Sequence, residues 1–348
     1  MIRGPFQPLR ARARHAAAFA LVAAVAAVAL PAGADEKPPE LKLSVAVGPA
    51  YPLGKAAALW AKRIAEASGG RLAVKVFPGA ALSQRSVARE FAALKDGAAD
   101  LAVGSTLYWS TPVRELGVVA LPWIAPGPKQ LGALLAPPVG DRLLAAVDRE
   151  GVVALALAPL GHRALATTDR VVQAPGDVAG LRVRMLGPLV VGEFFAALWA
   201  EPRALSFADA EAAFAAGAIN AQDGTLALFV ATRASAIGLK RVLLWDALAE
   251  AAVFAVNRAR WDAWTEADRA IVRDAARAVA AEVATLVPQD DDAAAKELGR
   301  RGMAVTRLTT AGRSAFVPAM RGYYERRAAL IGAELVKSAE DAVAAVAP

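Results

Sequence analysis

The feature that most constrains the fold is an alternation of apolar strands and amphipathic helices that occurs twice along the chain. In the first stretch, strands are expected at 41–48, 71–77 and 100–105, with helices between them near 53–67 and 83–97. In the second, a strand at 180–186 precedes helices at 190–199 and 208–217 and the segment INAQDG. Strands that alternate with helices in this way predict an α/β fold with parallel sheets.

The closing parts of the two stretches overlay with a constant offset of 120 residues. The residues that match are Gly97 with Gly217, Asp100 with Asn220, Gly104 with Gly224, and Ser105 with Thr225. In each stretch, a strand runs to a glycine and then to a hydroxyl side chain. Open α/β sheets bind ligands at this carboxyl end of their strands. We interpret the repeat as two similar lobes, each with small polar groups at this end of a strand.

The remaining segments predict connections between the lobes. Residues 242–258 read as two strands that cross from one lobe to the other, and a long helix over 265–287 begins at an N-cap, Thr265. QDDDAAAKELGRRG then follows that helix, before a strand at 303–308 and a last helix over about 310–330. We therefore expect a two-lobed clamshell of the periplasmic-binding-protein kind, type II-like, with interleaved lobes braced by the long helix. Lobe I comprises 35–160 plus about 250–290, and lobe II 161–249 plus about 291–348.

The first 34 residues read as a secretory signal peptide. Four arginines before residue 15 precede an apolar run at 16–31, and the small residues Ala32-Gly33-Ala34 follow it. The run is shorter than the roughly 20 residues that span a bilayer. We predict export to the periplasm with cleavage near Ala34; the alternative is an uncleaved membrane anchor. The chain has no cysteine, which excludes both disulfides and a lipid-modified cysteine.

The charge of the exported chain argues against nucleic-acid binding. The whole chain has 40 basic and 33 acidic residues, but four of the arginines lie in the leader, ahead of the first acidic residue, Asp35. The balance after cleavage is about +3, without the clustered basic and aromatic residues of a nucleic-acid site. A soluble protein without a nucleic-acid partner is expected.

No motif indicates an enzyme or a metal site. His162 is the only histidine after the leader, and no GxSxG, P-loop, GxGxxG or HExxH sequence occurs. The acidic QDDDA segment reads as a solvated part of a helix rather than as a metal site, and no cofactor is expected. Neither a carboxylate-dependent hydrolase nor another class of receptor is excluded by the residues alone.

Two arginines in one predicted strand point to a carboxylate ligand instead. Arg182 and Arg184 alternate with Val183, so that they share a face of the strand. A guanidinium can hold a carboxylate through two parallel hydrogen bonds, and this pairing is stronger where water is excluded. From composition alone, a strand arginine is more often a surface residue than part of a site, so these residues by themselves do not establish a carboxylate site.

Seven stretches, in order, resemble the extracytoplasmic solute-binding proteins of tripartite ATP-independent periplasmic (TRAP) transporters, the family typified by the C4-dicarboxylate receptor. The resemblance covers about 41–335, and the segment PGDVAGLRVRM is its most specific part. The other stretches are GGRLAVKVFPGAALSQ, FAALKDGAADLAVG, ELGVVALPWI, HRALATTDRVVQ, EPRALSFADAEAAFAAGAINAQDG and GMAVTRLT with FVPAMRGYYERRAALIG. The resemblance implies a protein that is not an enzyme. Such a protein closes on an organic acid and delivers it to the small and large membrane subunits of a transporter.

The resemblance also implies a set of ligand-binding residues. Arg184 matches the arginine that salt-bridges the ligand carboxylate in the family, Arg163 matches a second cationic contact, and Arg182 is left exposed. The other residues that the resemblance assigns to the site, as matches or close neighbours, are Tyr51, Pro52, Ser105, Thr106, Tyr108, Trp109, Phe207, Asn220, Gly224 and Thr225.

One position departs from the family pattern. Many members have an asparagine that contacts the carboxylate where this chain has Gly224, which offers only a backbone N–H and is expected to leave extra room. Thr225 or Asn220 is expected to substitute for the asparagine. The departure favours a monocarboxylate, or an aromatic or branched acid, over the common dicarboxylates. An exported hydrolase and a receptor for an ATP-driven or tricarboxylate importer are the alternatives, and the sequence leaves dimerisation open.

Overall fold

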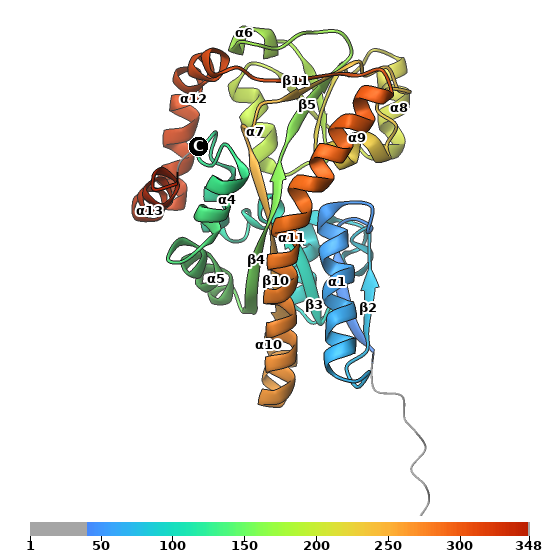
Figure 1. Ribbon diagram of the computed structural model, residues 1–348, viewed down its shortest axis with the longest axis vertical. Helices are drawn as coiled ribbons and strands as arrows, with labels where there is room; N and C mark the ends of the chain where they lie inside the picture. The colour runs from blue at the N-terminus through green and yellow to red at the C-terminus, as the bar shows by residue number, and fades with distance from the viewer. Residues whose placement is uncertain (1–39, 347–348) are drawn as a thin grey trace, which may run out of the picture. The chain divides into compact units, whose positions relative to one another are not determined.

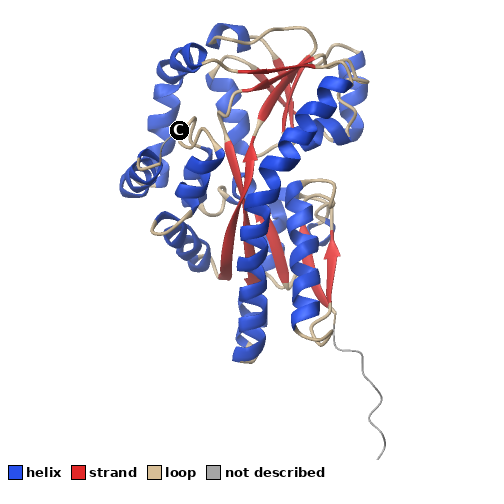
Figure 2. Ribbon diagram, viewed as in Figure 1, coloured by secondary structure: helices blue, strands red, loops and turns tan. Residues whose placement is uncertain are grey.

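Two mixed β-sheets with helices packed on them make up the part of the chain that the computed structural model describes, residues 40–346 (Figures 1 and 2). The predicted signal peptide and its cleavage site lie outside the described residues. The first sheet, sheet A, has the strand order β2-β1-β3-β10-β4. Its strands are β1 (Leu41–Val45), β2 (Val74–Phe77), β3 (Leu101–Ser105), β4 (Val152–His162) and β10 (Ala249–Asn257). β1 pairs in parallel with β2 and β3, whereas β10 runs antiparallel to β3 and β4.

The second sheet, sheet B, has the strand order β11-β9-β5-β8-β6-β7. Its strands are β5 (Ala164–Thr167), β6 (Arg182–Met185), β7 (Glu201–Ala204), β8 (Ala221–Gly224), β9 (Arg241–Leu244) and β11 (Ala304–Arg307). β6 pairs in parallel with β7 and β8, and β5 runs antiparallel to β8 and β9. The predicted α/β fold with parallel strands is therefore confirmed, with antiparallel strands added where the chain passes between the sheets.

Helices cover both sheets. Those of the first half are α1 (Pro52–Ala67), α2 (Glu90–Lys95), α3 (Thr106–Trp109), α4 (Pro128–Leu135) and α5 (Val139–Arg149). Those of the second half are α6 (Pro175–Val178), α7 (Leu189–Ala197), α8 (Phe207–Ala215), α9 (Leu226–Ala231), α10 (Arg258–Asp262), α11 (Glu266–Arg300), α12 (Thr310–Ile331) and α13 (Ala333–Ala344). Short 3-10 turns lie at Ala81–Ser83, Val87–Arg89 and Arg114–Ala120. Among the described residues, no helix is both long and apolar enough to cross a membrane.

Two strand connections between the sheets lie side by side. β4 of sheet A continues through Arg163 into β5 of sheet B, and β9 of sheet B continues into β10 of sheet A. The backbone N–H of Arg163 donates to the carbonyl of Leu248, 2.9 Å away, so the two crossings are joined by a hydrogen bond. The prediction of two crossing strands within 242–258 is confirmed.

Helix α11 packs on both sheets and is longer than predicted (Figure 1). The first part of α11 packs in the core of sheet A through residues such as Val279 and Val283, and Leu298 packs in the core of sheet B. We expected the helix to end before QDDDAAAKELGRRG, and this was wrong, because the helix continues through Pro288 to Arg300. The reason is tertiary packing at both ends, which outweighs the hydrogen bond that the proline removes.

A second prediction was also wrong. The segment 83–97 was expected to form one amphipathic helix, but α2 is confined to Glu90–Lys95 and is preceded by two 3-10 turns. Gln84 and Arg85 have positive φ angles of 57° and 60°, which an α-helix does not accept. The turn they form brings Arg85 to the ligand side of sheet A, as described below.

The repeat with an offset of 120 residues has a structural counterpart. At the start of β3, the Oδ2 of Asp100 accepts a hydrogen bond of 2.8 Å from the backbone N–H of Lys42; at the start of β8, the Oδ1 of Asn220 accepts one of the same length from Arg182. At the other end of these strands, Ser105 caps α3 and Thr225 caps α9 through their side-chain oxygens. Each sheet therefore presents the same strand–turn–helix unit to the space between them.

Candidate functional site

A cavity of about 240 Å³ lies where the strands of both sheets end. Its walls combine segments that follow β1, β3, β6 and β8 with α1, α9 and the two crossing strands. The lining residues are Ala46, Val47, Tyr51, Pro52, Leu53, Gly79, Arg85, Val87, Ser105, Tyr108, Leu160, Arg163, Leu186, Thr225, Leu228 and Glu250. The volume is below the roughly 300–1,000 Å³ of sites for drug-sized ligands, so this cavity fits a small molecule.

Six of the predicted site residues meet in this cavity. They are Tyr51, Pro52, Ser105, Tyr108, Arg163 and Thr225. Tyr51 precedes α1, whose first residue is Pro52, a position where a proline's missing N–H breaks no helical hydrogen bond. Burial raises the pKa of both tyrosine hydroxyls, so that both are protonated at neutral pH and can donate hydrogen bonds into the cavity.

Arg163 is held by two buried carboxylates, which the sequence analysis did not identify. Its Nε lies 3.0 and 2.8 Å from the two carboxylate oxygens of Asp223 in β8, and its Nη2 donates to the same carboxylate. Its Nη1 donates to Oε2 of Glu250 in β10, 3.0 Å away. Although burial by itself would lower the pKa of Arg163, the charges of Asp223 and Glu250 raise it. Arg163 thus links a strand of sheet B to a strand of sheet A.

Arg184 is fully buried in β6, and its Nε donates to the carbonyl oxygen of Leu205 at 3.1 Å. Burial lowers its pKa to about 10, against the opposing electrostatic influence of Tyr108 and Asp223, so the side chain is positively charged at neutral pH. It is not among the residues that line the cavity, but its charge acts on Tyr51 and Tyr108, which do line it. Arg182, by contrast, is half-buried, and its Nη2 donates to the carbonyl of Gly217.

The structure places the other predicted residues outside the cavity lining. Thr106 accepts a hydrogen bond from the backbone N–H of Ala251, and Trp109 packs edge-on against Phe91 in the core of sheet A. Asn220 lies at the start of β8, the opposite end from the cavity. Phe207 begins α8, and its side chain lies outside the described part of the structure.

The expectation of extra room at Gly224 is wrong. A Cβ atom added to Gly224 would lie 2.3 Å from Cδ2 of Leu228 and 3.3 Å from Cε1 of Phe229. The space that a side chain would need is already filled from the next turn of α9. The glycine therefore allows Leu228, an apolar side chain, to reach the cavity wall.

Glu250 and Asp223 could have been found from the sequence. The strand AEAAVFAVN is apolar except for Glu250 and its terminal asparagine, and a buried charge requires a partner. Asp223 stands two residues before Thr225, in the segment already singled out for the repeat. What the sequence did not show is that the two acids face the same arginine from different sheets.

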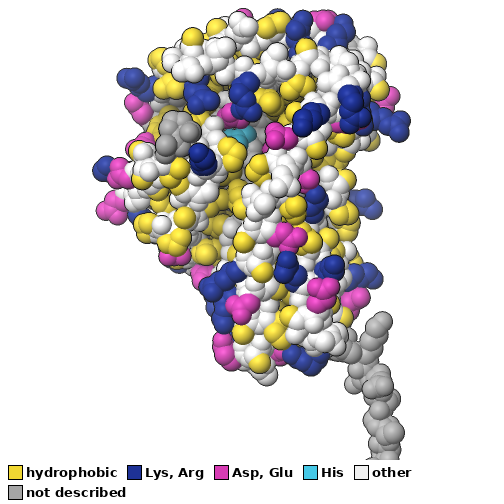
Figure 3. Space-filling model, in the orientation of Figure 1, with side chains coloured by type: hydrophobic (Ala, Val, Ile, Leu, Met, Phe, Trp, Pro, Cys, Tyr) yellow, Lys and Arg dark blue, Asp and Glu magenta, His cyan; other side chains and the backbone are white. Residues whose placement is uncertain are grey.

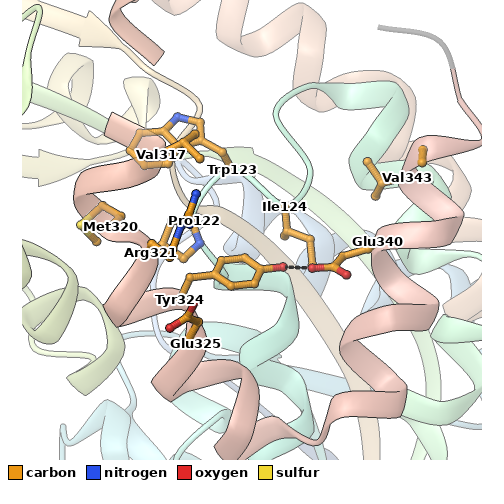
Figure 4. A pocket seen from close by; sticks show the side chains of 11 residues that line it. Pro122, Trp123, Ile124, Val317, Met320, Arg321, Tyr324, Glu325, Glu340 and Val343 are labelled. Atoms are coloured by element: carbon orange, nitrogen blue, oxygen red, sulfur yellow. Dashed lines mark hydrogen bonds between the residues drawn. The ribbon is translucent and has the colours of Figure 1, made fainter. Parts of the chain in front are cut away.

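A larger cavity, of about 540 Å³, lies between α12, α13 and the loop at Pro122–Ile124 (Figure 4). Tyr324 donates a hydrogen bond to Glu340 across it, at 2.6 Å, and Trp123, Val317 and Met320 contribute apolar surface. None of the predicted site residues lines it, and it is not at the ends of the sheet strands. The smaller cavity is therefore the candidate ligand site.

Within residues 40–346, no group of acidic or histidine side chains is arranged to hold a metal ion. His162, the histidine of the β4–β5 crossing, has its Nε2 2.7 Å from the carbonyl oxygen of Ala125, and its burial lowers its pKa. On the face shown in Figure 3, basic and acidic side chains are interspersed rather than gathered by sign. The site that the structure presents is a small chamber with tyrosine hydroxyls, buried ion pairs and aliphatic walls.

Comparisons with known proteins agree with this architecture. A family model described as bacterial extracellular solute-binding protein, family 7, matches residues 43–329. A solute-binding protein of Verminephrobacter eiseniae is 26% identical over 290 residues, which cover 82% of this chain and 85% of the relative. The C4-dicarboxylate-binding periplasmic protein of Vibrio cholerae is 24% identical over 299 residues, covering 83% and 86%.

A solved structure extends the agreement to the fold. The crystal structure of a TRAP periplasmic solute-binding protein from Ralstonia eutropha H16, with bound (S)-2-acetolactate, is 36% identical with a TM-score of 0.83. The alignment covers 88% of this chain and 99% of that protein. The clamshell architecture and the binding role predicted from the sequence are confirmed, and the expectation of a protein that is not an enzyme agrees with the family. The chain belongs to the bacterial extracellular solute-binding proteins of family 7, and it is a periplasmic solute-binding protein of the TRAP type.

Proposed function

We propose that this protein captures one small organic carboxylate in the 240 Å³ cavity, with Arg184 as the anchor of the carboxylate. The observation that supports the anchor is the burial of Arg184, a charged guanidinium, in β6 next to the tyrosines of the cavity. In a site closed to water, a planar guanidinium and two phenol hydroxyls provide charge and hydrogen-bond donors that suit a carboxylate. The solved relative from Ralstonia eutropha, with its bound acetolactate, supports an acid of similar size.

We propose that binding closes two lobes around the ligand. Lobe I would be built on sheet A, from 35–160 and about 250–290, and lobe II on sheet B, from 161–249 and residues after about 291. Helix α13 packs against α4 and α5 in the hydrophobic core on the sheet A side, and it therefore contacts lobe I. The crossings at Arg163 and Leu248 are the hinge of this movement.

In this proposal the closed protein delivers the acid to the small and large membrane subunits of a TRAP transporter. The leader, which is cleaved near Ala34, directs the protein to the periplasm, where the protein reaches those subunits. The rival receptors, for an ATP-driven or a tricarboxylate importer, are less well supported, because both the family model and the solved relative point to TRAP proteins.

The ligand can be identified by native mass spectrometry of protein purified without denaturation. Binding of that acid is then measured for the Arg184→Ala and Arg184→Lys variants. Arg184→Ala removes the positive charge that pairs with the ligand carboxylate, which should weaken binding by about 2–5 kcal/mol, or roughly 30-fold or more. Lysine should also bind poorly, because an ammonium does not reproduce the planar fork.

Arg182→Ala is the matched control, since Arg182 stands in the same strand but donates to a backbone carbonyl away from the cavity. It should change affinity little, and circular dichroism should show that all three variants are folded. If Arg184→Ala binds the acid as tightly as the unchanged protein, the anchor lies elsewhere.

A further inference from the structure

The cavity for an acidic ligand contains an acid of its own. Glu250 lies in β10, is 8% exposed and lines the cavity together with Ser105, Tyr108 and Arg163. Its Oε1 accepts a hydrogen bond of 2.5 Å from the Ser105 hydroxyl, and its Oε2 accepts one of 3.0 Å from Arg163. These bonds fix the carboxylate in place at the wall, where a ligand must approach it.

The buried charges around this site balance. Arg163 and Arg184 supply two positive charges, and Asp223 and Glu250 supply two negative charges. Arg85, which also lines the cavity, is exposed to solvent. One ligand carboxylate brings a single negative charge to this balanced group. A second ligand carboxylate would place another negative charge in the same small cavity as Glu250. Two negative charges at short range repel strongly there, because little water is present to screen them.

Much of the remaining lining is aliphatic, although the hydroxyls of Tyr51 and Thr225 also line the cavity. Ala46, Val47, Pro52, Leu53, Val87, Leu160, Leu186 and Leu228 contribute half of the 16 lining residues. These side chains offer no hydrogen bond to a second carboxylate, so a charged group placed against them would lose its hydration without compensation. An alkyl or branched body is favoured there instead.

We propose that Glu250 restricts the ligand site to monocarboxylates with a short aliphatic body, an inference that rests on the proposed carboxylate site. Glu250 acts by repelling a second carboxylate, while Ser105 and Arg163 hold it in the position from which it does so. The ligand is therefore a monoacid rather than a four-carbon diacid.

The proposal is tested by isothermal titration with pairs of acids of matched size. Butanoate is first compared with succinate. Succinamate is then compared with succinate, because it has an amide in place of one carboxylate and so lacks one negative charge at nearly the same shape. The unchanged protein should bind butanoate and succinamate at least about 10-fold more tightly than succinate. Glu250→Gln keeps the size of the side chain and its bond to Ser105, and it should reduce this preference about 10-fold or more.

Glu90→Gln controls for the effect of a Glu-to-Gln substitution in the protein interior, because Glu90 is also buried and accepts a hydrogen bond from Ser44 outside the cavity. It should leave the ratio between monoacid and diacid unchanged. The proposal is overturned if the unchanged protein binds succinate as tightly as succinamate, or if Glu250→Gln binds both with the original ratio. Should Glu250→Gln not fold, the comparison of succinate with succinamate on the unchanged protein decides alone.

If the diacids bind with Arg184 as anchor, only this inference fails. If no carboxylate binds at all, the proposed function itself fails.

Discussion

Asp223 offers a sharp test of how the cavity is held together. The carboxylate is 1% exposed and accepts hydrogen bonds from both Nε and Nη2 of Arg163. Asp223→Asn keeps the shape, removes the charge and replaces one of the two acceptor oxygens with an NH2 group that cannot accept from Arg163. Breaking a buried ion pair by removing one partner costs about 3–5 kcal/mol, because the remaining charge is left buried. Glu250 still faces Arg163 in the variant, so we expect the lower end, about 3 kcal/mol.

That loss can be read from thermal unfolding. The entropy of unfolding grows with chain length, at about 2.1 cal/mol/K per residue, so one kcal/mol shifts the melting temperature of a chain of about 310 residues by about 1.5 °C, and Asp223→Asn should lower it by roughly 4–5 °C. The measurement is circular dichroism during heating, with urea unfolding as a second method. Asp341→Asn is the matched control: it makes the same chemical change in the exposed Lys337–Asp341 pair, worth at most about 0.5 kcal/mol. If both variants melt within about 2 °C of the unchanged protein, the pair does not tie the two sheets together as argued.

Three further outcomes are expected. Gly224→Asn should destabilise the fold by about 1–3 kcal/mol through the clash with Leu228, and adding Leu228→Ala should recover most of the loss; full stability of the single variant in urea would contradict the packing described here. Burial, opposed by the hydrogen bond from Ser44, raises the pKa of Glu90 to about 8, so the stability linked to its proton is present below about pH 4.5 and lost as pH rises through 8. Compared with Glu90→Gln, the unchanged protein should therefore melt progressively lower between pH 5 and 9, and parallel curves would refute this. N-terminal sequencing of periplasmic protein should begin at or near Asp35, whereas an intact Met1 would show that the leader is not removed.

Local patterns allowed most of the fold to be predicted. Strands with apolar alternation and helices with a clear apolar face, such as β1, β3 and α1, appear where the sequence predicted them. The predictions failed where tertiary contacts decide: α11 continues through Pro288 because both of its ends are packed, and the helix expected from residue 83 is broken by the positive φ of Gln84 and Arg85.

The candidate site was predictable in part for the same reason. The strand ends pointed to Ser105 and Thr225, since the carboxyl ends of parallel strands gather at one edge. Asp223 and Glu250 were missed, although each is a lone acid in a buried strand, because their shared partner is set by the meeting of two sheets. Leu228 was missed because only the three-dimensional structure shows that it occupies the space beside Gly224.

Helix α11 has a mechanical consequence for the proposed closure. At about 1.5 Å per residue, its 35 residues extend about 52 Å, and its two ends are embedded in the cores of different sheets. Any rotation of one sheet toward the other must therefore bend the helix, and Pro288, which lacks an N–H, is the point of least resistance. In the proposed closure, the free energy needed to bend α11 would oppose ligand binding and would favour the return of the two sheets once the ligand leaves.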